Sequence, residues 1–154
     1  GYVADLYPER DTIVFGKRNK ETYTNSLSGS YVFDNKSWIT LNVRHYWSRI
    51  DYSRFYNLKE NGYLEAYPEY RENEDLNFNV FNVDLMYSWN FAPGSFLNVV
   101  WKNSIYQDQQ IRHNDFPGFI PNFKNTLDSD QVDNSISIKI SYYLDYKYLF
   151  KNSG

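Results

Sequence analysis

The sequence predicts an all-β fold: an antiparallel, up-and-down transmembrane β-barrel of which this chain supplies the C-terminal portion, about five or six strands. Three observations lead to this prediction. Apolar and polar residues alternate with a period of two over long stretches. The connections between these stretches are tight and long in turn, and aromatic side chains gather near the ends of the stretches. Together they favour strands that face lipid on one side over strands of a soluble core.

The composition fits membrane strands better than membrane helices. Aromatic residues make up 20% of the chain, yet the hydrophobic content is only 42% and the mean hydropathy is -0.70. No run approaches the roughly 18 consecutive apolar residues of a membrane helix, whereas barrel strands place every second residue on a polar interior. The absence of cysteine excludes disulfides and thiolate metal sites, and the net charge of -3 provides no basic stripe for nucleic acid.

The first two strands are predicted near residues 21–33 and 38–56, after a loop with one short strand at 1–19. In the first strand, apolar residues alternate with a side rich in hydroxyl groups, and in the second the alternation continues past Trp47 to Phe55. Residues 34–36 (DNK) supply a tight turn between them. A long outer loop follows at 57–76, with an Asn61-Gly62 turn signal and a run of charged residues.

The next two strands, 77–91 and 95–106, are predicted to form a hairpin with one apolar and one polar face. From Phe81 the odd positions are apolar or aromatic, and most even positions are polar. A three-residue loop, Ala92-Pro93-Gly94, joins the strands, with Gly94 in the left-handed conformation. This loop length places Asp84 directly opposite Lys102 on the polar face.

A second long outer loop is predicted at 107–133, and the last strand at 134–150 has the most regular alternation. If both tight turns are periplasmic, the chain reaches the periplasmic side at Phe150. The aromatic ending formed by Tyr146, Tyr148 and Phe150 is where the assembly signal of a barrel is expected.

The strand lengths and the strand number point to part of a larger barrel. The clear strands are about 13 to 19 residues long, against about 5 or 6 in most soluble proteins. They are too few to close a barrel, because the smallest single-chain bacterial barrels have about eight strands. The remaining strands are therefore expected upstream in the same polypeptide or in a different chain.

The alternation assigns side chains to the lumen or to lipid. Asp84 and Lys102 are predicted to form a charge pair that lines or fills the lumen, and the other charged residues on the lumen side are Arg44, Lys139, Asp145 and Lys147. The residues predicted to face lipid are Leu85, Trp89, Val99, Trp101, Ile138, Ile140 and Tyr142. Pro93 and Gly94 form the periplasmic turn.

No pattern predicts a catalytic, metal or cofactor site, and we do not expect an enzyme. His45 and His113 lie on different segments, and His45, beside Trp47, is expected at the membrane interface. The aspartates of residues 128–133 lack the glycine and the final glutamate of a calcium loop. The acidic residues of the 69–75 run form a charged loop rather than the carboxylate pair of a glycosidase cleft.

The outer segments are rich in aromatic residues, which leaves two interpretations open. The rings present stacking platforms to a glycan or a partner protein, or they pack on one another and plug the mouth of the barrel. The residues concerned are Tyr52, Phe55, Tyr56, Tyr63, Tyr67, Tyr70, Phe116, Phe119 and Phe123.

Four segments carry a resemblance to a known family: residues 43–58, 78–105, 123–127 and 134–146. With the FAPGS turn and the YYLDY ending, nearly the whole chain resembles the C-terminal region of a Bacteroidota envelope family. Its full-length members combine an N-terminal carbohydrate-binding-family-9-like domain with a large domain of unknown function. The resemblance implies the end of an outer-membrane barrel and leaves the activity open.

The expected role is therefore structural or transport-associated, in the outer membrane of a Gram-negative bacterium. Lipid and the rest of the barrel are the expected partners, and the chain is also a candidate subunit of a larger envelope complex. The alternative from a different class is a secreted all-β module that binds a carbohydrate or a protein.

Overall fold

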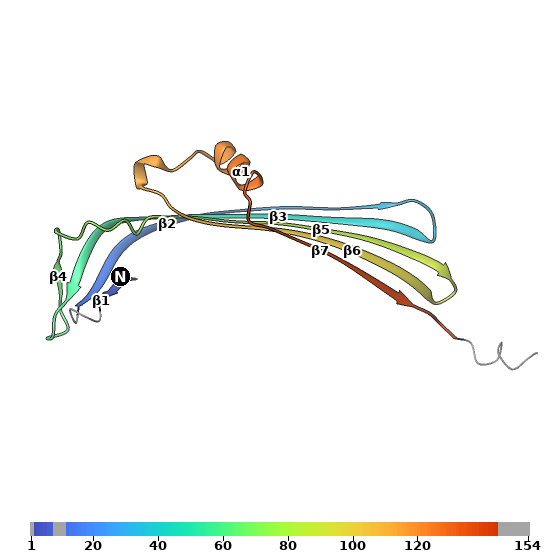
Figure 1. Cartoon of the computed structure of the whole chain (residues 1–154), viewed down its shortest axis with the longest axis horizontal. Helices are drawn as coiled ribbons and strands as arrows, with labels where there is room; N and C mark the ends of the chain where they lie inside the picture. Colours follow the sequence, from blue (N-terminus) through green and yellow to red (C-terminus); the bar gives the residue numbers. More distant parts are fainter. Residues whose placement is uncertain (1, 8–11, 145–154) are drawn as a thin grey trace, which may run out of the picture. The chain divides into compact units, whose positions relative to one another are not determined.

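The computed structural model describes residues 2–7 and 12–144, which form one β-sheet with a short helix over it (Figure 1). Six strands follow the order β1-β2-β3-β5-β6-β7, and the small strand β4 pairs with β3 beside this path. Their bounds are β1 Tyr2–Tyr7, β2 Thr12–Val32, β3 Ser37–Leu58, β4 Leu64–Ala66, β5 Leu76–Ala92, β6 Ser95–Gln110 and β7 Val132–Ser141. The all-β antiparallel prediction is confirmed, and the described strands form an open sheet rather than a closed barrel.

The chain divides into two compact units, which we describe separately. The helix unit comprises residues 1–25, 45–81 and 105–131, and the hairpin unit comprises residues 26–44, 82–104 and 132–154. The long strands β2, β3, β5 and β6 contribute residues to both units.

The strands are long, as the alternation predicts, but several bounds differ from the prediction. β2 has 21 residues and β3 has 22, and β2 begins at Thr12 rather than near residue 21. Its first part pairs with β1, from Tyr2 opposite Gly16 to Tyr7 opposite Thr12, with a register shift between Val3 and Asp5. Residues 17–20 are all polar and show no alternation, so the sequence pattern did not predict that the strand includes them. The predicted end of the last strand, 145–150, lies outside the described residues.

Strand alternation gives the sheet two faces, which we call the apolar face and the polar face. The apolar face carries the odd positions of β2, β3, β5 and β6. Contacts within each unit follow this assignment: the rings of Tyr23 and Trp47 stack at 5.0 Å, and Phe91 stacks on Tyr142 at 6.2 Å. Even positions of the last strand thus belong to the apolar face, as expected from its inverted pattern.

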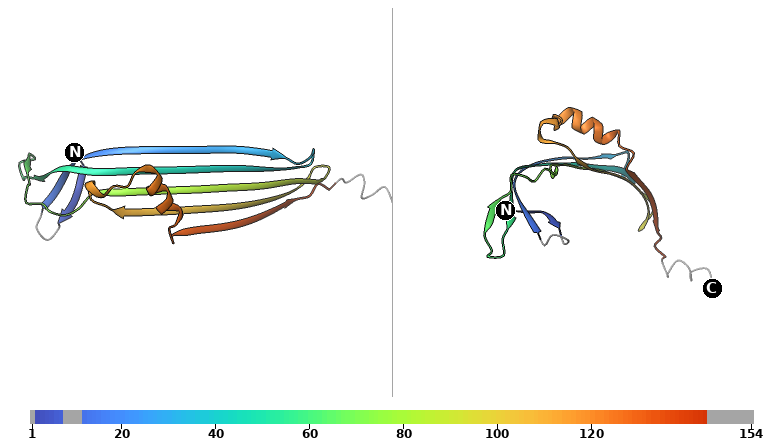
Figure 2. Two further views of the ribbon diagram at one scale, coloured as in Figure 1. Left: turned by 90° about the horizontal axis from the view of Figure 1, so that it is seen from above. Right: turned by 60° about the vertical axis from the view of Figure 1, so that its left-hand side comes forward.

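The segment predicted as the outer loop 107–133 differs most from the prediction. β6 continues to Gln110, a single turn of 3-10 helix spans His113–Asp115, and the helix α1 spans Phe119–Leu127 (Figure 2). Gly118 caps α1 in an extended conformation, and its carbonyl accepts the first helical hydrogen bond, from the N–H of Asn122 at 3.0 Å. Pro121 lies in the first turn, where its missing N–H is not needed.

The described helices are short, and none is long and apolar enough to cross a membrane.

Both tight turns contain the local interactions that their sequences predict. In the turn between β2 and β3, Asp34 Oδ1 accepts hydrogen bonds from the N–H groups of Lys36 and Ser37, each at 2.7 Å. The bond from the Lys36 N–H holds the pKa of the Asp34 carboxyl below its usual value. In the turn between β5 and β6, Gly94 has a φ of 71°, the left-handed conformation expected for this loop.

Candidate functional site: two sheet faces and a docked helix

The polar face of the hairpin unit carries the Asp84–Lys102 pair. Lys102 Nζ lies 4.0 Å from Asp84 Oδ1, in the register that the three-residue loop predicts. Two hydrogen bonds between β5 and β6 share that register: Ser88 Oγ to Asn98 Oδ1 and Ser104 Oγ to Asn82 Oδ1, each 2.8 Å long. Because both charged side chains are partly exposed, the pair is a weak contact at a long distance rather than a buried salt bridge.

Two of the other residues predicted to line the lumen, Arg44 and Lys139, lie in the described part of the chain. Arg44 and Lys139 have exposed side chains on the same face by alternation. Asp145 and Lys147 lie outside the described residues, as do Tyr146, Tyr148 and Phe150 of the predicted assembly signal.

The polar face is interrupted by aromatic side chains in each unit. In the hairpin unit, the rings of Trp38 on β3 and Phe96 on β6 lie 6.5 Å apart. In the helix unit, Phe78 contacts Tyr46 at 5.8 Å and Tyr106 at 5.3 Å, so three neighbouring strands share a row of rings. The even positions are therefore less uniformly polar than the alternation suggests.

The apolar face of the hairpin unit exposes several large hydrophobic side chains. Trp89 is 43% exposed, Ile138 and Tyr142 are each 65% exposed, and Ile140 is exposed to a similar extent. Leu85, Val99 and Trp101 are half-buried by neighbouring side chains. No described element of this unit packs over the face.

The apolar face of the helix unit is different, because polar side chains replace apolar ones there and α1 covers them (Figure 2). We call this group the amide cluster; its members are Asn77 and Asn79 of β5, Gln107 of β6, and Asn122 and Thr126 of α1. All five are buried. The alternation of polar and apolar residues did not predict this cluster.

The hydrogen bonds of the amide cluster join α1 to the sheet. The amides of Asn79 and Asn122 form a reciprocal pair: Asn122 Nδ2 donates to Asn79 Oδ1 at 2.7 Å, and Asn79 Nδ2 donates to Asn122 Oδ1 at 3.2 Å. Asn77 Nδ2 also donates to Asn122 Oδ1, at 3.0 Å, and Trp47 Nε1 donates to Asn77 Oδ1 at 2.7 Å. Thr126 Oγ1 donates to the Asn122 carbonyl at 2.9 Å. Because buried amides are costly when unpaired, this network fixes where α1 can lie.

An aromatic box around His45 completes the interface beneath α1. The His45 ring lies 5.0 Å from Phe123, 5.9 Å from Phe119 and 6.3 Å from Phe81. His45 Nε2 contacts Asn79 Oδ1 at 3.4 Å, and its Nδ1 has no hydrogen-bond partner among the described residues. The residue is only 3% exposed, because α1 and its aromatic side chains pack over it.

The described residues offer no constellation for metal chemistry. Nowhere in residues 13–144 do three or more histidine, aspartate or glutamate side chains gather as a metal site would require. Asp128 and Asp130 line an open polar pocket of about 480 Å³ beside Gln107, without forming such a group.

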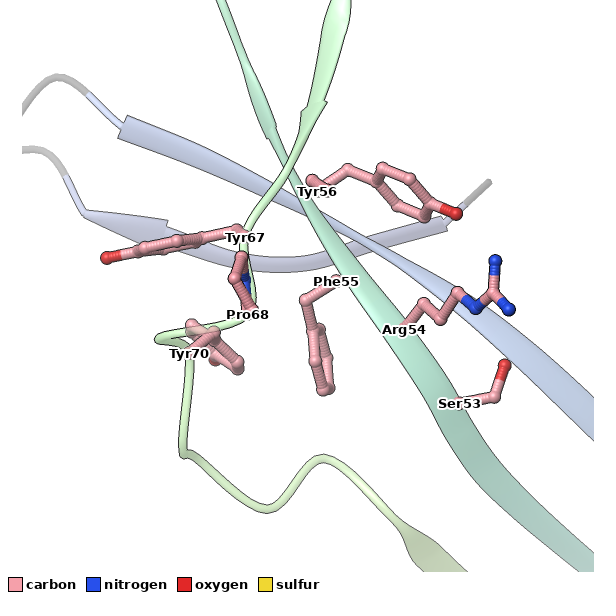
Figure 3. A pocket seen from close by; sticks show the side chains of 8 residues that line it. Ser53, Arg54, Phe55, Tyr56, Tyr67, Pro68 and Tyr70 are labelled. Carbon is pink, nitrogen blue, oxygen red and sulfur yellow. The ribbon is translucent and has the colours of Figure 1, made fainter.

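A second pocket, of about 510 Å³, lies where β3 meets the segment after β4 (Figure 3). The Phe55 ring lies 4.5 Å from Tyr70 and stacks on Tyr52 at 5.7 Å. Figure 3 shows Phe55 and Tyr70 together, whereas Arg54 and Tyr56 extend from the other side of β3. The residues that line this pocket are Ser53, Arg54, Phe55, Tyr56, Ala66, Tyr67, Pro68 and Tyr70. Several predicted stacking residues thus lie near one another, although they do not converge on a single point.

Comparison with known proteins identifies a family but no activity. No curated protein and no solved structure matches the chain. One family model matches residues 1–153, and its description is a domain of unknown function, DUF5916. Since this match covers nearly the whole sequence, the chain belongs to the DUF5916 family.

Proposed function

We propose that this chain forms part of a β-barrel in the outer membrane of a Gram-negative bacterium. The apolar face of the hairpin unit meets lipid, and the polar face lines or fills the lumen. The observation that carries the proposal is the exposed apolar face, with side chains such as Trp89 of β5 and Ile138 of β7, on a sheet whose four longest strands have 16 to 22 residues.

The polarity of the two faces supports lipid over a second protein layer. Large exposed apolar patches usually mark a membrane or a protein contact. Here the opposite face carries Asp84, Lys102 and the hydrogen-bonded pairs between β5 and β6. An apolar outside and a polar inside on the same strands are the pattern of barrels that cross a bilayer.

The assignment to an envelope family rests on the resemblance of the sequence to the C-terminal region of that family. It favours a Bacteroidota envelope protein whose upstream part carries a carbohydrate-binding-family-9-like domain. The missing strands then come from that upstream part or from another envelope protein, and the role is structural or transport-associated, within an envelope complex.

A pair of neighbouring substitutions on β7 tests the proposal. Ile138 and Ser137 are both exposed, and they lie on opposite faces. We expect Ile138→Arg in the full-length protein to destabilise the membrane-inserted state by about 2–4 kcal/mol, because arginine is costly on the lipid side of a barrel. The measurements are heat-modifiable migration in gels and flotation with membranes.

Ser137→Arg is the matched control and should insert like the wild type. Equal insertion of both variants contradicts the proposal, because the apolar face would then not contact lipid.

The second candidate is a secreted all-β module that binds a carbohydrate or a protein. The observation in its favour is the pocket with Phe55, Tyr67 and Tyr70, because ligand pockets are commonly lined by aromatic side chains with a few polar groups. This candidate predicts a protein that sediments as a soluble monomer without detergent, the outcome that the membrane proposal does not allow.

A further inference from the structure

The position of α1 on the sheet decides on which side of the barrel wall it lies. The sheet residues beneath α1 are His45 of β3, Asn77, Asn79 and Phe81 of β5, and Gln107 of β6, all at odd positions. Along β5, the same parity continues from Phe81 to Leu85 and Trp89. The helix therefore covers odd positions in the helix unit, and in the hairpin unit it is the odd positions of β5 and β6 that the proposed function assigns to lipid. It does not cover the lumen face, as a plug in the barrel mouth would.

The helix is held at this position and is not a loose loop segment. The Asn122 amide is buried and takes part in three hydrogen bonds to the sheet: the reciprocal pair with Asn79 and the bond from Asn77. Phe123 packs between the rings of His45 and Phe81, at 5.0 Å and 5.7 Å. Separating α1 from the sheet would expose or orphan all of these groups at once.

The outward side of α1 is itself apolar along one flank. Ile120 is 71% exposed and Leu127 is 43% exposed, and helical geometry places them on one side because they are seven residues apart. Lys124, four residues after Ile120, is exposed between them. An exposed apolar flank with a lysine beside it is the arrangement found in helices that lie in the surface layer of a membrane.

We propose that α1 is an external helix that lies in the interfacial layer of the bilayer. Ile120 and Leu127 contact the boundary between headgroups and acyl chains, and Lys124 reaches anionic headgroups. This inference rests on the proposed function, because it requires the apolar face to meet lipid. It replaces the expectation that the aromatic residues of the 107–133 segment plug the barrel mouth.

Site-specific labels distinguish these arrangements in the full-length protein. The sequence contains no cysteine, so Ile120→Cys, Asn125→Cys and Ile138→Cys each introduce one thiol into this region for a fluorescent label. The labelled proteins are inserted into vesicles of phosphatidylcholine and phosphatidylglycerol that contain lipids with a spin-label quencher near the headgroup. Asn125 is the control on α1, since it lies on the flank away from Ile120 and Leu127.

We expect the label at residue 120 to be quenched severalfold more strongly than the label at residue 125, and the label at residue 138 to be quenched as well. Quenching at 138 but equally weak quenching at 120 and 125 overturns the external helix and leaves the proposed function standing. No quenching at 138 overturns the proposed function, and the external helix with it.

Discussion

At the scale of single residues, two glycines in the described part of the chain have a positive φ and allow backbone strain to be separated from side-chain crowding. Gly94 has a φ of 71° and Gly62 a φ of 79°. A Cβ at Gly94 would lie 3.0 Å from Tyr143 Cβ, whereas a Cβ at Gly62 would meet nothing within 4 Å. An alanine at either position therefore meets the same backbone strain, but only an alanine at Gly94 also crowds a neighbouring side chain.

We expect Gly94→Ala to lower the free energy of unfolding more than Gly62→Ala does. The left-handed conformation costs an L-residue about 1–2 kcal/mol at either position. At Gly94 the new methyl group must also displace Tyr143, so the loss there should exceed that range. Urea unfolding of the two variants in the same detergent measures the difference, and equal losses would show that the Tyr143 contact adds nothing.

For single residues, alternation predicts which side chains are neighbours across a hairpin but not which of them are buried. Asp84 and Lys102 were predictable as neighbours because loop length and parity fix the register of a hairpin. The burial of Ser88, which is 1% exposed and hydrogen-bonded to Asn98, was not predictable from its polar character. Burial depends on the size of the side chains on neighbouring strands, and parity carries no information about them.

At the scale of elements, the strands were predictable and α1 was not. Period-two alternation is a local property, so it identifies strands without knowledge of their partners. The nine residues of α1 include Pro121 and two asparagines, Asn122 and Asn125, which favour a helix only weakly. Its stabilising contacts come from Asn77 and Asn79, far away in the sequence. The sequence does contain one signal: Asn77 and Asn79 occupy odd positions of β5, where the alternation predicts apolar residues.

Asn122 tests how much the amide cluster contributes to the docking of α1. In Asn122→Ala, the amides of Asn77 and Asn79 lose a partner while still buried, which should cost about 1–3 kcal/mol of stability. Asn125→Ala, on the exposed side of the same helix, should change stability by no more than about 0.5 kcal/mol. Urea unfolding gives both values.

Hydrogen exchange gives the local readout for this pair of variants. The α1 amide protons should exchange faster in Asn122→Ala, while those of β5 and β6 stay protected. Similar exchange in the two variants would mean that the aromatic contacts of Phe119 and Phe123 hold the helix without the amides.

At the scale of the whole molecule, the open sheet is the feature that limits what the chain can do alone. The strand order runs from β1 to β7 without returning, so both are edge strands among the described residues. β7 is ten residues long and exposes the backbone N–H and C=O groups of its free edge. In water these groups bind solvent, but in the hydrocarbon layer each unpaired group costs several kcal/mol. Insertion into a bilayer therefore requires a partner for this edge.

The isolated 154-residue chain should consequently fail to insert as a monomer. We expect residues 1–154 refolded alone to form associated species and no heat-modifiable band, because the free edges of β1 and β7 pair between copies. The full-length protein under the same conditions should give one monomeric, heat-modifiable band. Sedimentation in detergent and gel migration before and after boiling measure both states. A monomeric, heat-modifiable isolated chain would contradict the argument, since these strands would then close a sheet without help from upstream sequence or from another protein.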